Sequence, residues 1–222
     1  MCNRARAPGD ADFLFSQMRL NWATPRPMDN RFNPAELVPK TRAHVIREDE
    51  RGRGVDFMGW DILDGAAAWP MTNVRNLRLP QWKALASDPK KRCLIPVTEF
   101  AEWTPAPVDL GDGKKPIKGE MWFDVPEQPV FAIAGFWQEI VGERFFAMVT
   151  CDANEIVKPI HPKAMVTIVD PEHYDRWLTC DYEEALTLQR PYPAEKMTVR
   201  GPDFPTRGIR DPRPPRALAS VP

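Results

Sequence analysis

Apolar runs alternate with short polar or proline-containing breaks along most of the chain, a pattern typical of strands joined by tight connections. Val141-Gly142-Glu143 lies between two apolar runs, as a hairpin turn would. Pro96 falls within another run and predicts a bent or edge strand there. The strands we expect cover residues 43–46, 55–60, 93–103, 120–125, 130–140, 144–150 and 166–169.

Apolar residues at helical spacing predict short helices over residues 10–20, 79–86, 152–158, 170–177 and 182–188. Asp10 suits the cap of the first, and Pro171 suits a first helical position. We therefore predict an α+β fold, with a strongly bent, mostly antiparallel, barrel-like sheet and short flanking helices in one domain over residues 1–190. Residues 191–222 are rich in proline and arginine and are expected to form a partly disordered C-terminal extension. Trp82, Trp103, Trp137 and Trp177 are the tryptophans expected in the core.

Composition narrows the choice of function. The 222 residues carry a formal net charge of −1, so nucleic-acid binding would need a local basic patch. The four cysteines are scattered without a CxxC or Cys/His cluster, which argues against a zinc site and a disulfide framework. Neither a signal peptide nor a membrane-spanning run is recognisable. We expect a cytoplasmic monomer without metal or cofactor.

Cys2 is the residue with the most distinctive chemistry. If Met1 is removed, the Cys2 thiol and a free α-amine lie on adjacent carbons and can close a five-membered ring on an aldehyde carbon. The α-amine has a pKa of roughly 8, against about 10.4 for lysine, so it is neutral and nucleophilic far more often. A cysteine at position 2 is more often part of a frayed terminus, so other residues must support a function.

That support is an ordered set of motifs, of which none is specific alone. Together they resemble the SOS-response-associated peptidase (SRAP) family from Cys2 to about Val169. The chain departs from the family at Asn3, where glycine is usual, at Met58-Gly59-Trp60-Asp61, and at Pro162-Lys163-Ala164-Met165. The set comprises Cys2 with Arg4, Arg31-Phe32-Asn33-Pro34, Asn73-Val74-Arg75, Arg92-Cys93-Leu94-Ile95-Pro96, Glu99-Phe100-Ala101-Glu102-Trp103, and Ile160-His161.

The resemblance implies covalent capture of abasic sites in single-stranded DNA during the DNA damage response. Cys2 would form a Schiff base and then a thiazolidine, and Glu102 would transfer protons. His161 would protonate the sugar ring oxygen, and Asn73 would hydrogen-bond the terminal amine or the sugar. Each has a plainer interpretation: Glu102 as an outward-facing surface residue, His161 as a loop histidine without a role, and Asn73 as part of a polar loop.

DNA contacts follow from the same resemblance. Asn33 would order the loop around Cys2, and Trp60 and Trp69 would stack on exposed bases. A bound protein would then be associated with the nucleoid. The residues expected to follow the phosphates are Arg4, Arg31, Lys40, Arg42, Arg75 and Arg78.

Two other functions stay open. The first is an N-terminal-nucleophile hydrolase or peptidase, in which Cys2 attacks through its thiol and uses its own amine as base. Turnover of a peptide or amide without an aldehyde would favour it. The second is a non-enzymatic reader of modified or single-stranded DNA, whose affinity would survive loss of the thiol.

Overall fold

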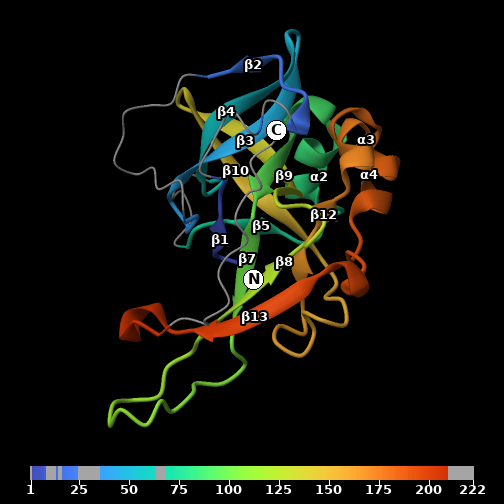
Figure 1. The fold of residues 1–222 in the computed structure, drawn as a ribbon. Helices are drawn as coiled ribbons and strands as arrows, with labels where there is room; N and C mark the ends of the chain where they lie inside the picture. Colours follow the sequence, from blue (N-terminus) through green and yellow to red (C-terminus); the bar gives the residue numbers. More distant parts are fainter. Residues whose placement is uncertain (1, 9–13, 15–16, 25–35, 64–68, 210–222) are drawn as a thin grey trace, which may run out of the picture.

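The structure is a computed structural model that describes residues 2–8, 14, 17–24, 36–63 and 69–209. Five strands form a closed barrel in the order β10, β4, β3, β6, β9 and back to β10 (Figure 1). Only the β10–β4 contact in this ring is parallel. The ring strands are β3 (Arg42–Asp49), β4 (Gly52–Trp60), β6 (Arg92–Val97), β9 (Phe131–Ile140) and β10 (Glu143–Cys151).

The barrel closes tightly at Gly135. This residue of β9 pairs with Cys93 of β6 on one side and Met148 of β10 on the other. A Cβ atom at Gly135 would lie 2.3 Å from Ile95 Cδ1 and 2.9 Å from Ala147 O, so no larger residue fits without a shift. Short strands extend the sheet at its margins: β2 (Trp22–Ala23), β5 (Asn73–Val74), β11 (Met165–Val166) and β12 (Ile168–Val169).

A second, four-stranded sheet lies beside the barrel in the order β1-β7-β8-β13. Its strands are β1 (Ala5–Arg6), β7 (Glu99–Trp103), β8 (Glu120–Asp124) and β13 (Thr198–Asp203). Only Thr98 separates β6 of the barrel from β7 of this sheet, so the chain passes directly from one to the other. Figure 1 shows the small sheet at the foot of the barrel, with the residue 104–119 connection projecting beyond it.

Helices α2 (Pro80–Ser87), α3 (Tyr174–Thr179) and α4 (Tyr182–Leu188) cover one side of the barrel (Figure 1). Arg92 ties α2 and α3 to the barrel, because its buried guanidinium donates to Ala86 O at 3.1 Å and to Trp177 O at 3.0 Å. None of the described helices is long and apolar enough to cross a membrane. Single-turn 3-10 helices complete the fold: η1 (Pro89–Lys91), η2 (Pro171–His173), η3 (Ala194–Lys196) and η4 (Pro205–Arg207).

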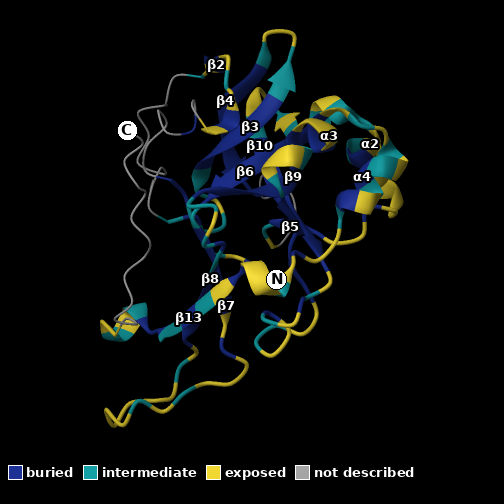
Figure 2. Ribbon diagram, turned by 45° about the vertical axis from the view of Figure 1, so that its right-hand side comes forward, coloured by how far each residue is buried: buried dark blue, intermediate teal, exposed yellow. Residues whose placement is uncertain are grey.

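The apolar strands have two buried faces (Figure 2). Along β6, Cys93 and Ile95 belong to the cluster inside the barrel, whereas Leu94 packs in the cluster beneath the helices. Such strands read as continuous apolar runs, since alternate side chains enter different cores. The α+β fold with a bent, mostly antiparallel, barrel-like sheet is confirmed.

Several local predictions need correction. Residues 152–158 contain no helix, since the turn there covers residues 155–160, and residues 93–103 form two strands that part at Thr98. Trp103 is 46% exposed, because it faces outward at the end of β7, whereas Trp82, Trp137 and Trp177 are buried. The chain also remains part of the fold after residue 190, since β13 pairs with β8. Residues 10–13, 15 and 16 of the first expected helix and the last 13 residues lie outside the described ranges.

Candidate functional site

The N-terminal segment is held on both sides, which fixes where Cys2 lies. Strand β1 pairs antiparallel with β7, with Ala5 opposite Phe100. Ala5 also exchanges two backbone hydrogen bonds with Leu37, at 3.0 and 2.7 Å. Closer to Cys2, Ala101 N donates to Arg4 O at 2.9 Å. Cys2 therefore belongs to the interior cluster of the barrel and is not part of a frayed end.

The Cys2 side chain is only 1% exposed. Its thiol donates to Arg4 O at 3.4 Å, and its backbone carbonyl accepts a hydrogen bond from Asn73 Nδ2 at 2.7 Å. Burial raises the pKa of the thiol well above its ordinary value, and the negative charge of Glu102 raises it further. The thiol is therefore neutral at physiological pH.

Glu102 lies on the inner side of β7, opposite Met121 of β8. It is 3% exposed, and its Oε1 finds no hydrogen-bond partner within the described part of the chain. Burial raises the pKa of its carboxyl from 4.5 to about 7. The interpretation of Glu102 as an outward-facing surface residue is therefore wrong, and the group titrates where proton transfer at neutral pH requires it.

Asn73 holds the Cys2 backbone through the hydrogen bond from its Nδ2 to Cys2 O. It lies on β5, which pairs in parallel with β10. Besides Cys2 O, its Nδ2 lies 2.9 Å from Thr72 Oγ1 and 3.3 Å from Asn3 Oδ1, while Thr72 Oγ1 donates to Asn3 Oδ1 at 2.7 Å. Asn73 Oδ1 is buried without a partner among the described residues. Thr72 and Asn3 were missed by the sequence analysis, although Thr72 directly precedes the Asn-x-Arg motif.

His161 ends the turn that follows β10. Its backbone N donates to Val157 O at 2.9 Å, and its Nδ1 lies 2.7 Å from Ala164 O. Because a carbonyl oxygen only accepts, Nδ1 carries the hydrogen in this contact, and Nε2 is the ring atom able to take a proton. The residue is partly exposed.

Arg75 contacts the segment that carries His161, and its side chain does not project freely into solvent. Its guanidinium donates to Lys163 O and forms an ion pair with the exposed carboxylate of Asp152. These two partners flank the turn that carries His161. Gln189 Nε2 donates to Arg75 O at 2.5 Å and holds the backbone at this point. In this structure Arg75 thus connects β5 to the residue 152–163 segment.

The remaining candidate cations differ in their surroundings. Arg4 pairs with Glu120 at 2.9 Å and Glu36 at 3.1 Å, so two carboxylates already compensate its charge. Arg42 pairs with Glu143. Lys40 and Arg78 are exposed, whereas Arg31 and Asn33 lie outside the described residues.

The two tryptophans proposed to stack on bases lie in opposite environments. Trp69 is 80% exposed, so its ring is accessible to a base. Trp60 is 0% exposed: its Nε1 donates to Thr72 O at 2.9 Å, and its ring stacks on Phe146 at 6.1 Å between centroids. The prediction that Trp60 stacks on bases is wrong, because β4 directs this ring into the barrel beside β10. Trp60 instead holds the Thr72 backbone next to Asn73.

The model of the family described as SOS response associated peptidase (SRAP) matches residues 1–201. No curated protein matches the chain. Solved structures do. A protein from Bordetella bronchiseptica has a TM-score of 0.71 at 21% identity, with 89% of this chain and 98% of that chain covered. One from Bacteroides thetaiotaomicron has a TM-score of 0.67 at 20% identity, covering 89% and 90%. A phage-related protein from B. bronchiseptica has 0.63 at 18%, covering 90% and 93%. At these identities the likeness shows the fold alone.

Proposed function

The chain belongs to the SOS response associated peptidase family, and we propose that its mature form captures abasic sites in single-stranded DNA covalently through Cys2. The observation that carries the proposal is a buried Cys2 beside Glu102, a buried carboxyl whose pKa is raised to about 7. Such a group gives and accepts protons at neutral pH, which both imine formation and ring closure require.

In the proposed reaction, removal of Met1 leaves the Cys2 nitrogen as a primary α-amine. The amine attacks the aldehyde carbon of the opened deoxyribose, and loss of one water gives an imine. The thiol sulfur then adds to the imine carbon, while its proton passes through Glu102 to the nitrogen. The product is a thiazolidine. Because the imine is consumed, the electron sink that promotes strand cleavage by β-elimination is lost.

Asn73 and His161 have supporting parts in this proposal. The hydrogen bond from Asn73 Nδ2 to Cys2 O fixes the orientation of the residue whose amine and thiol must both reach one carbon. The contact of His161 Nδ1 with Ala164 O sets the tautomer, so that Nε2 can exchange a proton with the sugar ring oxygen during ring opening.

The hydrolase alternative fits the site less well. A cysteine that attacks as a thiolate needs a lowered pKa, as near a cation or a helix N-terminus. The Cys2 thiol has the reverse environment, because burial and the Glu102 charge both raise its pKa. An α-amine with an ordinary pKa of roughly 8 is then the better first nucleophile. The removal of Met1 is compatible with either chemistry.

We propose that the DNA contacts involve the exposed Trp69 and Arg78, with Arg75 and Arg31 as further candidates. An exposed indole stacks on bases of any sequence, and an arginine contacts phosphate without sequence preference. The single-stranded form suits this, since its bases are open to stacking. Arg4 is a weaker candidate, because Glu36 and Glu120 already pair with it.

The decisive experiment is the intact mass of the protein after incubation with an abasic single-stranded oligonucleotide. The expected adduct has the mass of the protein without Met1 plus the oligonucleotide minus one water, and it survives heating. Cys2→Ala should lose the heat-stable adduct and retain at most an imine that needs reduction to be trapped. Cys180→Ala is the matched control, since Cys180 is the least buried of the other cysteines. A stable adduct in Cys2→Ala, or Met1 retained on reactive protein, would contradict the proposal.

A further inference from the structure

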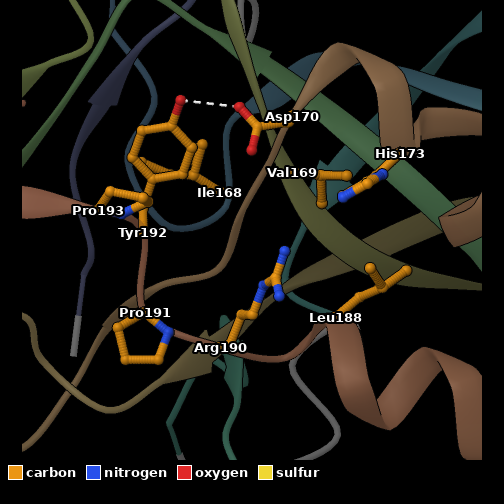
Figure 3. Close-up of a pocket in the computed structure, with 9 residues that line it drawn as sticks. All are labelled: Ile168, Val169, Asp170, His173, Leu188, Arg190, Pro191, Tyr192 and Pro193. Atoms are coloured by element: carbon orange, nitrogen blue, oxygen red, sulfur yellow. Dashed lines mark hydrogen bonds between the residues drawn. The ribbon is translucent and has the colours of Figure 1, made fainter. Parts of the chain in front are cut away.

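A cavity of about 340 Å³ lies between two segments that flank helices α3 and α4 in the sequence (Figure 3). Residues 168–170 and His173 form one side, and residues 188 and 190–193 form the other. Cys2, Glu102 and Asn73 do not line it. Its volume is near the lower end of the range for small-molecule pockets, about 300–1,000 Å³, which suits a ligand smaller than a nucleotide.

Two opposite charges face this cavity without pairing with each other. The guanidinium of Arg190 points into it from one wall (Figure 3), and no carboxylate in the described ranges lies within ion-pair distance of Arg190. On the opposite wall, Asp170 uses Oδ1 to accept from Tyr192 OH at 2.9 Å and from Gln128 Nε2 at 3.3 Å. Its Oδ2 takes part in neither bond and is turned away from Tyr192.

This charge arrangement selects for a ligand that carries both signs. A simple anion attracted by Arg190 would be repelled by Asp170. A simple cation attracted by Asp170 would be repelled by Arg190. A zwitterion satisfies both, with its carboxylate on the Arg190 fork and its ammonium on Asp170 Oδ2. Val169 and Leu188 line the cavity to one side of the two charged groups (Figure 3), where a branched apolar side chain would be covered.

We propose that this cavity binds a free α-amino acid with an apolar side chain of about the size of leucine. Both ends of the ligand must be free, because each supplies the charge that one wall requires. Neither Cys2 nor Glu102 lines this cavity, and the proposal does not rest on the DNA chemistry.

Histidine signals in the proton NMR spectrum provide the test. The chain has three histidines, and His173 alone among them lines the cavity, whereas His161 and His44 do not. Titration with L-leucine should give a saturable shift of the His173 ring signal, which the His173→Gln variant assigns. N-acetyl-leucine lacks the ammonium and leucinamide lacks the carboxylate, so each should bind about tenfold or more weakly, as expected for one lost charge-assisted contact.

Arg190→Gln should weaken leucine binding by a similar factor, with thermal unfolding unchanged. Lys196→Gln removes one positive charge from the same exposed segment without lining the cavity, and it should bind leucine as the wild type does. The proposal is overturned if leucine gives no saturable shift of the His173 signal up to about 10 mM, because a dissociation constant above that concentration would not indicate a specific site. It is also overturned if N-acetyl-leucine or inorganic phosphate binds as well as leucine, since either result would mean simple anion binding.

Discussion

Two glutamates three positions apart on β7 have the same burial and different surroundings. Glu99 and Glu102 are each 3% exposed. Glu99 accepts from Arg6 at 2.5 Å and from two nitrogens of Arg200 at 3.0 Å each, and Arg6 also lies over the Trp122 ring at 3.9 Å. Glu102 has an oxygen without any hydrogen-bond partner among the described residues, and its pKa is raised to about 7.

The difference distinguishes a carboxylate that stabilises the fold from a carboxyl that can exchange a proton near neutral pH. A buried carboxylate that is paired with cations holds its neighbours in place, so Glu99 joins β1, β7 and β13. A buried carboxyl without a full set of hydrogen bonds favours its neutral form, and burial raises the pKa of Glu102 to about 7. Because side chains alternate along a strand, residues 99 and 102 face opposite sides of the sheet, and only Glu102 faces Cys2.

Glu99→Gln should have the largest effect on stability. It would leave Arg6 without its carboxylate and Arg200 with Asp203 alone, at 3.4 Å, and loss of one partner of a buried ion pair costs about 3–5 kcal/mol. Urea unfolding should show this loss. The folded fraction should still crosslink abasic DNA at close to the wild-type rate, since Glu99 faces away from Cys2. A large rate loss with unchanged stability would contradict the assignment of Glu99 to structure.

Glu102→Gln is the matched substitution on the same strand, and it should have the converse effect. The amide has nearly the same shape but cannot exchange the proton, so we expect crosslinking to slow by roughly a hundredfold. Single-turnover rates on an abasic oligonucleotide would measure this. A wild-type rate for Glu102→Gln would remove the residue from the mechanism, and a loss equal to that of Glu99→Gln would erase the distinction between the two.

The raised pKa of Glu102 also predicts a pH-dependent stability. The folded state holds this proton up to about pH 7, whereas the unfolded chain releases it near 4.5. Stability from this group is therefore full below pH 4.5 and is lost as pH rises through 7. At pH 8 the wild type should be less stable than Glu102→Gln by about 3 kcal/mol, and at pH 4 the two should be equal. Equal stability at both pH values would mean that Glu102 is not desolvated in solution.

The sequence predicted the main strands of the fold well. Long apolar runs such as residues 130–140 became β9, because both faces of a barrel strand are buried when helices cover the outside. The pattern did not predict β13, whose Pro202 and Arg200 read as a loop. That strand depends on pairing with β8 and on the ion pairs of Arg200 with Glu99, which are tertiary contacts.

For the site, residue types and order placed Cys2, Asn73 and Glu102 together, and the structure brings them into one region. Apolar periodicity alone did not decide whether Glu102 faced inward, because β7 has apolar residues on both of its faces. The prediction that Trp60 contacts DNA was wrong because the pairing register of β4 with β10 places its ring against Phe146, and residue type alone does not reveal this register. The Asn3–Thr72 hydrogen bond was beyond sequence reasoning, since it joins residues 69 positions apart.

Arg75 extends the comparison to an exposed ion pair, and it gives the smallest expected effect. Its partner Asp152 is 82% exposed, and such surface pairs contribute about 0–1 kcal/mol, so a DNA phosphate can displace the carboxylate. Asp152→Asn should therefore tighten binding to single-stranded DNA a few-fold at low salt, with less gain at high salt because screening weakens both contacts. Arg75→Ala should weaken binding and reduce the salt slope by about one charge. Asp175→Asn is the control, since it removes an equally exposed carboxylate whose partner is Arg53. If Asp152→Asn binds no better than Asp175→Asn, Arg75 positions the His161 turn and does not contact phosphate.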